Sequence, residues 1–143
     1  RFTETFNDYL IYGMDKEILA EIYKLLPGGL KNFREKFNMD KSILFQAHPF
    51  RDGMELADPK LLDGMETFNM HNGHNSRVGK AVRYAHDNGI KRAIAGTDFH
   101  EYGREGAAAV RTKILPKDSF EFADILKKGD YILEIGGSSI VLP

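Results

Sequence analysis

Short apolar runs alternate along the chain with longer stretches in which apolar residues recur every three or four positions. The short runs predict buried strands, and the longer stretches predict helices that lay one apolar side on a sheet. The expected strands are residues 8–12, 43–47, 65–69, 90–95, 107–115 and 131–135, with 140–142 as a short partner. The expected helices are residues 15–26, 30–38, 76–89 and 118–129.

Capping residues support these helix boundaries. The residues expected to cap the N-termini are Asp15, Asn75 or Ser76, and Asp118 with Glu121. Gly89 and Gly129 stand where a helix ends in a left-handed residue. Strands that alternate with helices at this spacing indicate parallel βαβ units joined by right-handed connections. The predicted fold class is therefore α/β.

Composition narrows the class of protein. With 143 residues, 42% hydrophobic and 29% charged, the chain is long enough for one compact core and too short for two domains, so we expect a single domain over residues 1–143. The formal net charge of -1 gives no basic field for nucleic-acid binding. No apolar run approaches the roughly 20 residues of a membrane span. Cysteine is absent, which favours a cytoplasmic setting and leaves only imidazole and carboxylate as metal ligands.

Residues typical of metal sites follow two of the predicted strands. The run 43–47 leads into His48, and the run 93–95 leads through Gly96 to Asp98 and His100. Residues two positions apart in an extended chain point to the same side, so Asp98 and His100 would form half of a metal site. The alternative for each residue is structural: a histidine held by a local hydrogen bond, or an aspartate that caps the next element.

These motifs, with Glu66-x-x-Asn69 between them, resemble the PHP family, the metal-dependent phosphoesterases of the polymerase and histidinol phosphatase type. The order of the motifs matches, and the resemblance covers most of the chain from about Asn7 onward. It implies the C-terminal part of a distorted (β/α)7 barrel with mostly parallel strands and flanking helices. It also implies an N-terminal His-x-His motif, which is absent because no histidine precedes His48.

The resemblance implies roles for several residues. His48, Asp98 and His100 would be the catalytic metal ligands, and the ions would be Mn, Zn or Fe, two or three in a complete family member. Arginine in the loops at the same end suits a phosphate, because guanidinium offers paired hydrogen bonds. The residues expected on the substrate side are Arg51, Glu66, Asn69, His71 and Arg104, with His74 and Arg77 in the same loops. A salt bridge at the mouth of the barrel is the alternative role for Glu66.

The implied function is hydrolysis of a phosphorylated small molecule by metal-activated water. Without the His-x-His strand this chain would hold one ion or none, unless a longer parent chain supplies that strand. A non-catalytic module used for stability or interaction is therefore an alternative, and an amidohydrolase-like barrel with the same ligand chemistry is another. A parallel barrel without its first strands exposes two edges, through which we expect self-association.

Overall fold

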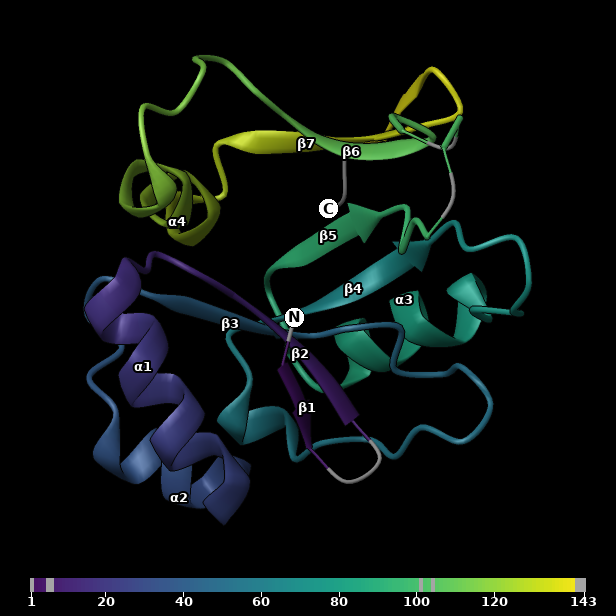
Figure 1. The fold of residues 1–143 in the computed structure, drawn as a ribbon. Helices are drawn as coiled ribbons and strands as arrows, with labels where there is room; N and C mark the ends of the chain where they lie inside the picture. The colour runs from purple at the N-terminus through teal and green to yellow at the C-terminus, as the bar shows by residue number, and fades with distance from the viewer. Residues whose placement is uncertain (1, 5–6, 101, 104, 141–143) are drawn as a thin grey trace.

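Two sheets form the frame of the computed structural model, which describes residues 2–4, 7–100, 102–103 and 105–140 (Figure 1). The larger sheet has the order β1-β2-β3-β4-β5, with strands Phe2–Glu4, Asn7–Tyr12, Ile43–Gln46, Gly64–Asn69 and Ala93–Gly96. The smaller sheet has the order β6-β7-β8, with strands Ala108–Thr112, Tyr131–Ile135 and Ser138–Ile140. The helices are α1 (Lys16–Leu25), α2 (Leu30–Lys36), α3 (Val78–Asp87) and α4 (Ser119–Lys128), with short 3-10 turns η1 (Leu26–Gly28) and η2 (Pro59–Leu61).

The predicted elements are present, with ends shifted by a few residues. Asp15 and Asp118 cap α1 and α4 as expected, since each carboxylate accepts hydrogen bonds from two backbone N–H groups of the first turn. Gly129 ends α4 in a left-handed conformation. The expected cap of α3 is wrong, because the helix begins after Arg77, which has no side-chain cap. Residues 141–142 of the predicted last strand lie outside the described residues.

The prediction of a (β/α)7 barrel fragment is wrong. Only the pairs β3–β4 and β4–β5 are parallel, while β1–β2, β2–β3 and both pairs of the second sheet are antiparallel. The larger sheet ends at β1 and β5, and β6 begins a separate sheet. A barrel closes only when tilt and register agree around the whole ring, and an open mixed sheet cannot satisfy that condition.

Strand direction failed to follow from the sequence because a helix between two strands does not by itself make them parallel. Between β2 and β3 the chain forms two helices, and it returns beside β2 in the opposite direction, with Tyr9 facing Gln46 and Tyr12 facing Ile43. Gly136 and Gly137 join β7 and β8, and both have positive φ angles, 57° and 79°. That is the backbone of a tight hairpin turn, which forces antiparallel pairing.

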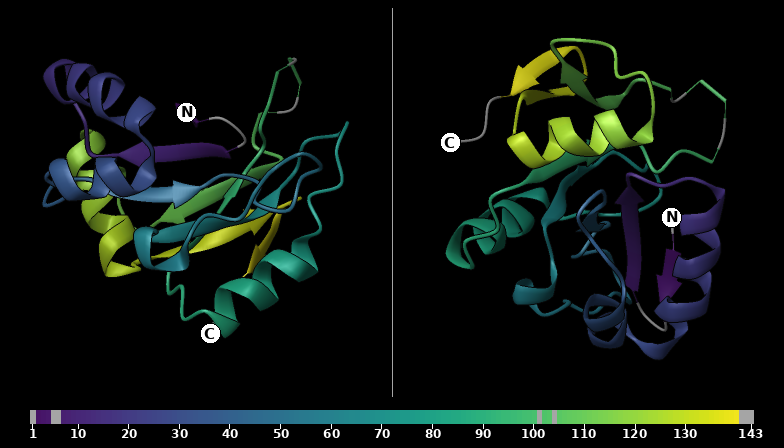
Figure 2. Two further views of the ribbon diagram at one scale, coloured as in Figure 1. Left: turned by 90° about the horizontal axis from the view of Figure 1, so that it is seen from below. Right: turned by 90° about the vertical axis from the view of Figure 1, so that its left-hand side faces the viewer.

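The core lies on both faces of β3. Leu44 packs in a cluster with Ile22 of α1 and Phe33 of α2, and all three are fully buried. The next residue, Phe45, points to the other face and packs against Leu126 of α4. Figure 2 shows α1 and α2 on one side of the larger sheet and α4 on the other. This double cover makes β3 the central strand of the fold and fixes where it ends.

No helix in the described ranges is long and apolar enough to cross a membrane.

Candidate functional site

Three parallel strands bring their carboxyl ends to one edge of the larger sheet. In Figure 1, β4 and β5 point to the side of the molecule where the following loops gather. His48 follows β3, Asn69 ends β4, and Asp98 follows β5. The antiparallel β2 adds Asp8, because its carbonyl accepts a hydrogen bond of 2.9 Å from the Ala47 backbone N–H beside His48. The edge thus collects an imidazole and two carboxylates from segments far apart in the sequence.

His48 is the most buried of these groups. It is 2% exposed, and its Nε2 lies 3.3 Å from Asp8 Oδ2 and 3.9 Å from Asp98 Oδ2. Neither ring nitrogen has a hydrogen-bond partner in the part of the chain that the structure describes. Burial lowers the pKa of His48, and the carboxylates of Asp98 and Asp8 counteract this only in part. The imidazole is therefore neutral at pH 7, and its Nε2 faces both carboxylate oxygens.

Asp98 joins His48 to the loop residues. Arg51 Nη1 donates to Asp98 Oδ2 over 2.9 Å, so one carboxylate oxygen faces both the guanidinium and the buried imidazole. His100 lies beside Asp98, but its Nδ1 is 2.8 Å from the Asp98 carbonyl oxygen and 3.9 Å from Oδ1. The His100 side chain is 57% exposed. The structure thus brings His48 and Asp98 together and leaves the His100 ring at the surface.

The backbone at this edge adopts unusual angles. His48 and Asp98 have φ values of +26° and +46°, in the left-handed region that residues with a side chain rarely enter. His48 also precedes Pro49, and a residue before proline normally prefers an extended conformation. Such residues cost on the order of 1–3 kcal/mol each and persist only where the surrounding structure holds them. Their presence at both predicted ligands indicates that the fold, rather than local preference, sets these two positions.

Glu66 holds the backbone of His48 in place. Its Oε2 accepts a hydrogen bond of 2.8 Å from the His48 backbone N–H and one of 3.0 Å from Asn69 Nδ2. In a regular strand, residues 66 and 69 would face opposite sides, but a bulge between Glu66 and Phe68 turns both toward the site. Burial raises the pKa of Glu66 to about 7, although its two hydrogen bonds act in the opposite direction. Glu66 therefore supports the site from within, rather than facing a substrate.

Asn69 connects this support to the following loop. Its Oδ1 accepts hydrogen bonds from the His71 backbone N–H (3.2 Å) and from Ser76 Oγ (3.3 Å). Asn69 is 5% exposed, so it also lies beneath the surface that a substrate would reach. Both residues of the Glu-x-x-Asn motif thus organise the site from below.

Three imidazoles form the outer rim. The rings of His71 and His74 have centroids 4.6 Å apart, and those of His71 and His100 lie 5.5 Å apart. Partial desolvation, together with the nearby Arg51 and His71, lowers the pKa of His74. A small cavity of about 70 Å³ opens among Met70, His71, Asp98, Phe99 and His100. Its size suits a single small group rather than a whole substrate, since ligand pockets are typically about 300–1,000 Å³.

The arginines expected on the substrate side fall into three groups. Arg51 reaches the site, where its Nη1 contacts Asp98 and its other terminal nitrogen, Nη2, contacts His74. Arg77 instead donates to the Phe50 carbonyl and pairs with Asp52, so it ties two loops together. Arg104 lies outside the described residues.

Asp8 was missed by sequence reasoning. It stands at the start of β2, and no motif marks it; it reaches the site only because β2 pairs in the antiparallel sense beside β3. A sequence signal for that pairing does not exist in the residues around it, so only the three-dimensional arrangement reveals this carboxylate.

The side chains at this edge are of the types that bind a divalent cation, but too few of those that the structure describes are grouped closely enough to hold one. Imidazole and carboxylate are suitable ligands for Mn, Zn or Fe, and Nε2 of His48, which has no hydrogen-bond partner among the described residues, faces two carboxylates. Among the described residues, however, no three His, Cys, Asp or Glu side chains are grouped so that they could hold a metal ion. Arg51 bonds to the Asp98 oxygen that faces His48. A bound ion would therefore require Arg51 to shift its contact.

Gly96 gives Glu66 the room that it needs. A Cβ atom at Gly96 would lie 2.3 Å from Glu66 Oε1, and Glu66 cannot move away without losing its bonds to His48 and Asn69. We expect Gly96→Ala to lower the free energy of unfolding by about 1–3 kcal/mol, as overpacking does in buried sites. Urea unfolding measures this change.

The control for this prediction is Gly79→Ala in α3, where an added Cβ meets no other heavy atom within 4 Å. Alanine has the higher helix propensity, so this variant should be as stable as the original chain or more stable. Equal stability of the Gly96→Ala variant and the original chain would show that Glu66 is not held as described.

No protein-family model, no curated protein and no solved structure matches this chain.

Proposed function

We propose that the edge formed by β3, β4 and β5 hydrolyses phosphoesters with a divalent cation. His48, Asp98 and Asp8 come nearest to a ligand set; to hold the ion they would have to draw together, and Arg51 would have to leave Asp98. The observation that supports this proposal is the buried His48 imidazole, whose ring nitrogens have no hydrogen-bond partner among the described residues while Nε2 faces two carboxylate oxygens. A buried nitrogen that forms no hydrogen bond is unfavourable, and a cation between Nε2 and the two carboxylates would satisfy all three groups. The lowered pKa of His48 keeps the imidazole neutral, which is the form that binds a cation.

The chemistry divides between the cation and the loop residues. When bound, a divalent ion would lower the pKa of a water molecule and polarise a phosphoryl oxygen. The Arg51 guanidinium, which is partly exposed, suits a phosphoryl oxygen because its N–H groups form a fork. The imidazoles of His71, His74 and His100 lie at the rim, where one of them would donate a proton to the leaving oxygen. Glu66 and Asn69 hold His48 and the loop in position.

The proposed chemistry rests on the motifs by which the sequence resembles the PHP phosphoesterases, and not on the barrel fold of that family. His48, Glu66, Asn69 and Asp98 meet at one sheet edge even though no barrel forms. Mn, Zn and Fe are the proposed ions, and a phosphorylated small molecule is the proposed substrate.

The lack of cysteine supports a cytoplasmic setting. Self-association through the edges at β1 and β5 is a further proposal, since unpaired strand edges favour pairing.

A non-catalytic module is the second candidate. The bond between Arg51 and Asp98 favours it, because a guanidinium already satisfies the carboxylate that a catalytic ion would need. In that case the site would be a structural ion pair, and the fold would serve stability or interaction.

The test begins with protein freed of metal by a chelator. Calorimetric titration with Mn²⁺ and Zn²⁺ measures binding, and p-nitrophenyl phosphate, bis-p-nitrophenyl phosphate and p-nitroacetanilide serve as substrates. We expect Mn²⁺ or Zn²⁺ to bind and to start hydrolysis of a phosphoester. Binding without turnover would favour the module, hydrolysis of the anilide alone would favour an amidohydrolase-like reaction, and absence of binding would contradict the proposal.

A further inference from the structure

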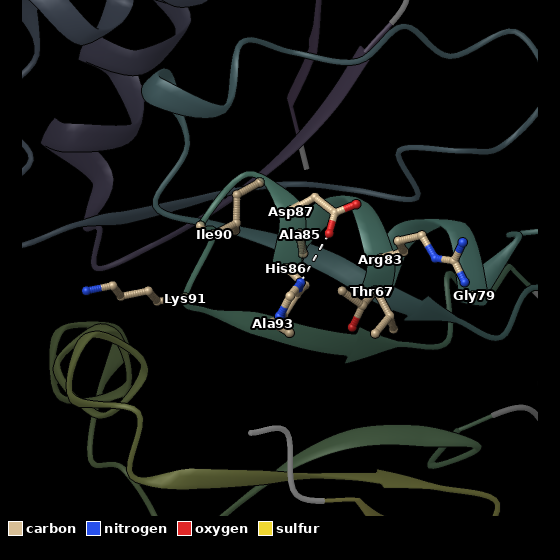
Figure 3. A pocket seen from close by; sticks show the side chains of 11 residues that line it. Thr67, Gly79, Arg83, Ala85, His86, Asp87, Ile90, Lys91 and Ala93 are labelled. Carbon is tan, nitrogen blue, oxygen red and sulfur yellow. Dashed lines mark hydrogen bonds and ion pairs between the residues drawn. The ribbon is translucent and has the colours of Figure 1, made fainter.

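A second cavity, of about 760 Å³, lies on the outer side of β4 and β5 beside α3 (Figure 3). None of the residues that form the candidate site lines it. Its volume falls in the range of about 300–1,000 Å³ that small-molecule pockets occupy. We call this cavity the α3 groove and define it by the residues discussed below, Thr67, Val82, Arg83, Ile90, Lys91 and Ala93.

The wall of the α3 groove is apolar. Val82 belongs to α3, Ile90 to the turn after it and Ala93 to the start of β5, and all three are partly exposed. The deeper residues of the helix, Ala81 and Ala85, are buried against the sheet. The helix therefore covers only part of the apolar surface available to it, and a strip of that surface remains open to a ligand.

One polar atom lies at the base of the α3 groove. Thr67, the residue within the β4 bulge, is 2% exposed, and its Oγ1 has no hydrogen-bond partner among the described residues. In Figure 3, Thr67 projects on the same side as His86 and Ala93. A buried hydroxyl without a partner is unfavourable, so a ligand atom that bonds to it would gain affinity.

The two ends of the α3 groove carry positive charge. Figure 3 shows Arg83 toward one end and Lys91 toward the other. Both side chains are exposed, and neither forms an ion pair within the described ranges. Asp87 also lines the groove, and its Oδ1 lies 3.1 Å from Nδ1 of His86, so this carboxylate is engaged by a side chain of the same helix. The groove thus combines an apolar wall with cationic ends.

We propose that the α3 groove binds a small amphipathic anion, a molecule with an apolar chain or ring system and a carboxylate. The apolar part lies on Val82, Ile90 and Ala93, and the carboxylate pairs with Arg83 or Lys91. Charge complementarity selects an anion over a neutral or cationic molecule, and the volume selects a small molecule over a protein segment. This binding site is independent of the proposed hydrolysis.

The test uses octanoate as the probe and octanol as its neutral counterpart, with two-dimensional amide NMR of the intact chain. We expect octanoate to shift the resonances of Thr67 and of residues 79–93, and to bind more tightly than octanol. Arg83→Gln and Lys91→Gln together should weaken octanoate binding by about two- to fivefold and leave octanol unchanged, as loss of an exposed ion pair would. The single variants show which end holds the carboxylate.

Two further variants make the test specific. Val82→Asp places a carboxylate on the wall and should remove octanoate binding, with the NMR spectrum showing that the chain is still folded. Lys80→Gln removes an exposed charge of α3 that does not line the groove, and should change nothing. Equal binding of octanoate and octanol, an equal loss in Lys80→Gln, or shifts outside these residues would overturn the proposal. Shifts that depend on protein concentration without any probe would also overturn it, because a second copy of the chain would then cover the groove.

Discussion

Replacing His48 by asparagine is expected to abolish cation binding and to lower metal-dependent phosphoester hydrolysis by roughly 100-fold or more, the scale of losing a group that holds a catalytic ion. The imidazole is the buried nitrogen donor at the site, and it faces both carboxylates. Asparagine suits the position because it tolerates the positive φ angle of +26° better than most residues. The backbone bond to Glu66 therefore stays available, and the change removes the donor without displacing the strand.

The measurements for this variant are calorimetric titration with Mn²⁺ and the rate on a phosphoester substrate. His86→Asn is the matched control, since His86 is an exposed histidine of α3 whose side chain is 82% exposed. It should bind the cation and turn over substrate like the original chain. If His48→Asn retained full cation binding, the ligands would have to lie elsewhere, and the proposed site would be wrong.

Replacing Glu66 by glutamine is expected to raise stability above neutral pH and to change it little in mild acid. The pKa of the folded carboxyl group is raised from 4.5 to about 7 by burial. Between these pH values the folded chain holds a proton that the unfolded chain has released. Glu66 therefore makes the folded chain less stable as pH rises from 4.5 to about 7. The shift corresponds to roughly 3 kcal/mol at about pH 8. Glutamine carries no charge at any pH and keeps an oxygen that can accept the His48 N–H bond.

Urea unfolding in the presence of a chelator, at several pH values from about 5 to 8, measures this effect. His48 affects the pH dependence of stability in the opposite direction. Because its pKa is lowered in the folded chain, the unfolded chain binds this proton more readily, and the folded chain loses stability as pH falls below 6.5. The difference between variant and original chain at each pH isolates Glu66. Glu21→Gln, an exposed change in α1, is the control. A Glu66→Gln difference that stays constant with pH would show that the buried carboxyl does not titrate in this range.

Local structure was predictable because it depends on neighbouring residues. Asp15 and Asp118 cap their helices with hydrogen bonds to the next two or three residues, so the sequence contains the whole interaction. The apolar run of β3 likewise predicted a buried strand, and all four residues of β3 are buried. Predictions of this kind needed no knowledge of which segments meet.

Strand order and direction depend on distant contacts, and there the sequence was insufficient. The antiparallel return of β2 beside β3 overturns the barrel, and it also brings Asp8 to the site. The Gly136-Gly137 turn did carry a local signal for a hairpin, since two glycines suit the positive φ angles of a tight turn. The ion pair of Arg51 with Asp98 had no such signal, because it joins two loops that are 47 positions apart.

The candidate site was predicted in part for a specific reason. His48 follows β3 and Asp98 follows β5, two parallel strands separated only by β4, and the carboxyl ends of such strands meet at one edge whether or not a barrel closes. Their approach to 3.9 Å follows from that local rule. The orientation of the His100 ring depends on the loop after β5, where no regular element fixes it.

The double cover of β3 has a consequence for the motions of the molecule. Since Leu44 and Phe45 are fully buried on opposite faces, exposing the backbone of β3 to solvent would require both helical layers to detach. Amide hydrogens of this strand should therefore exchange only through global opening, whereas those of the loop with His71 and His74 exchange through local fluctuation. Strand β3, which holds the site, and the loop with His71 and His74 thus belong to different cooperative units. The loop is free to rearrange around an arriving molecule while β3 stays in place.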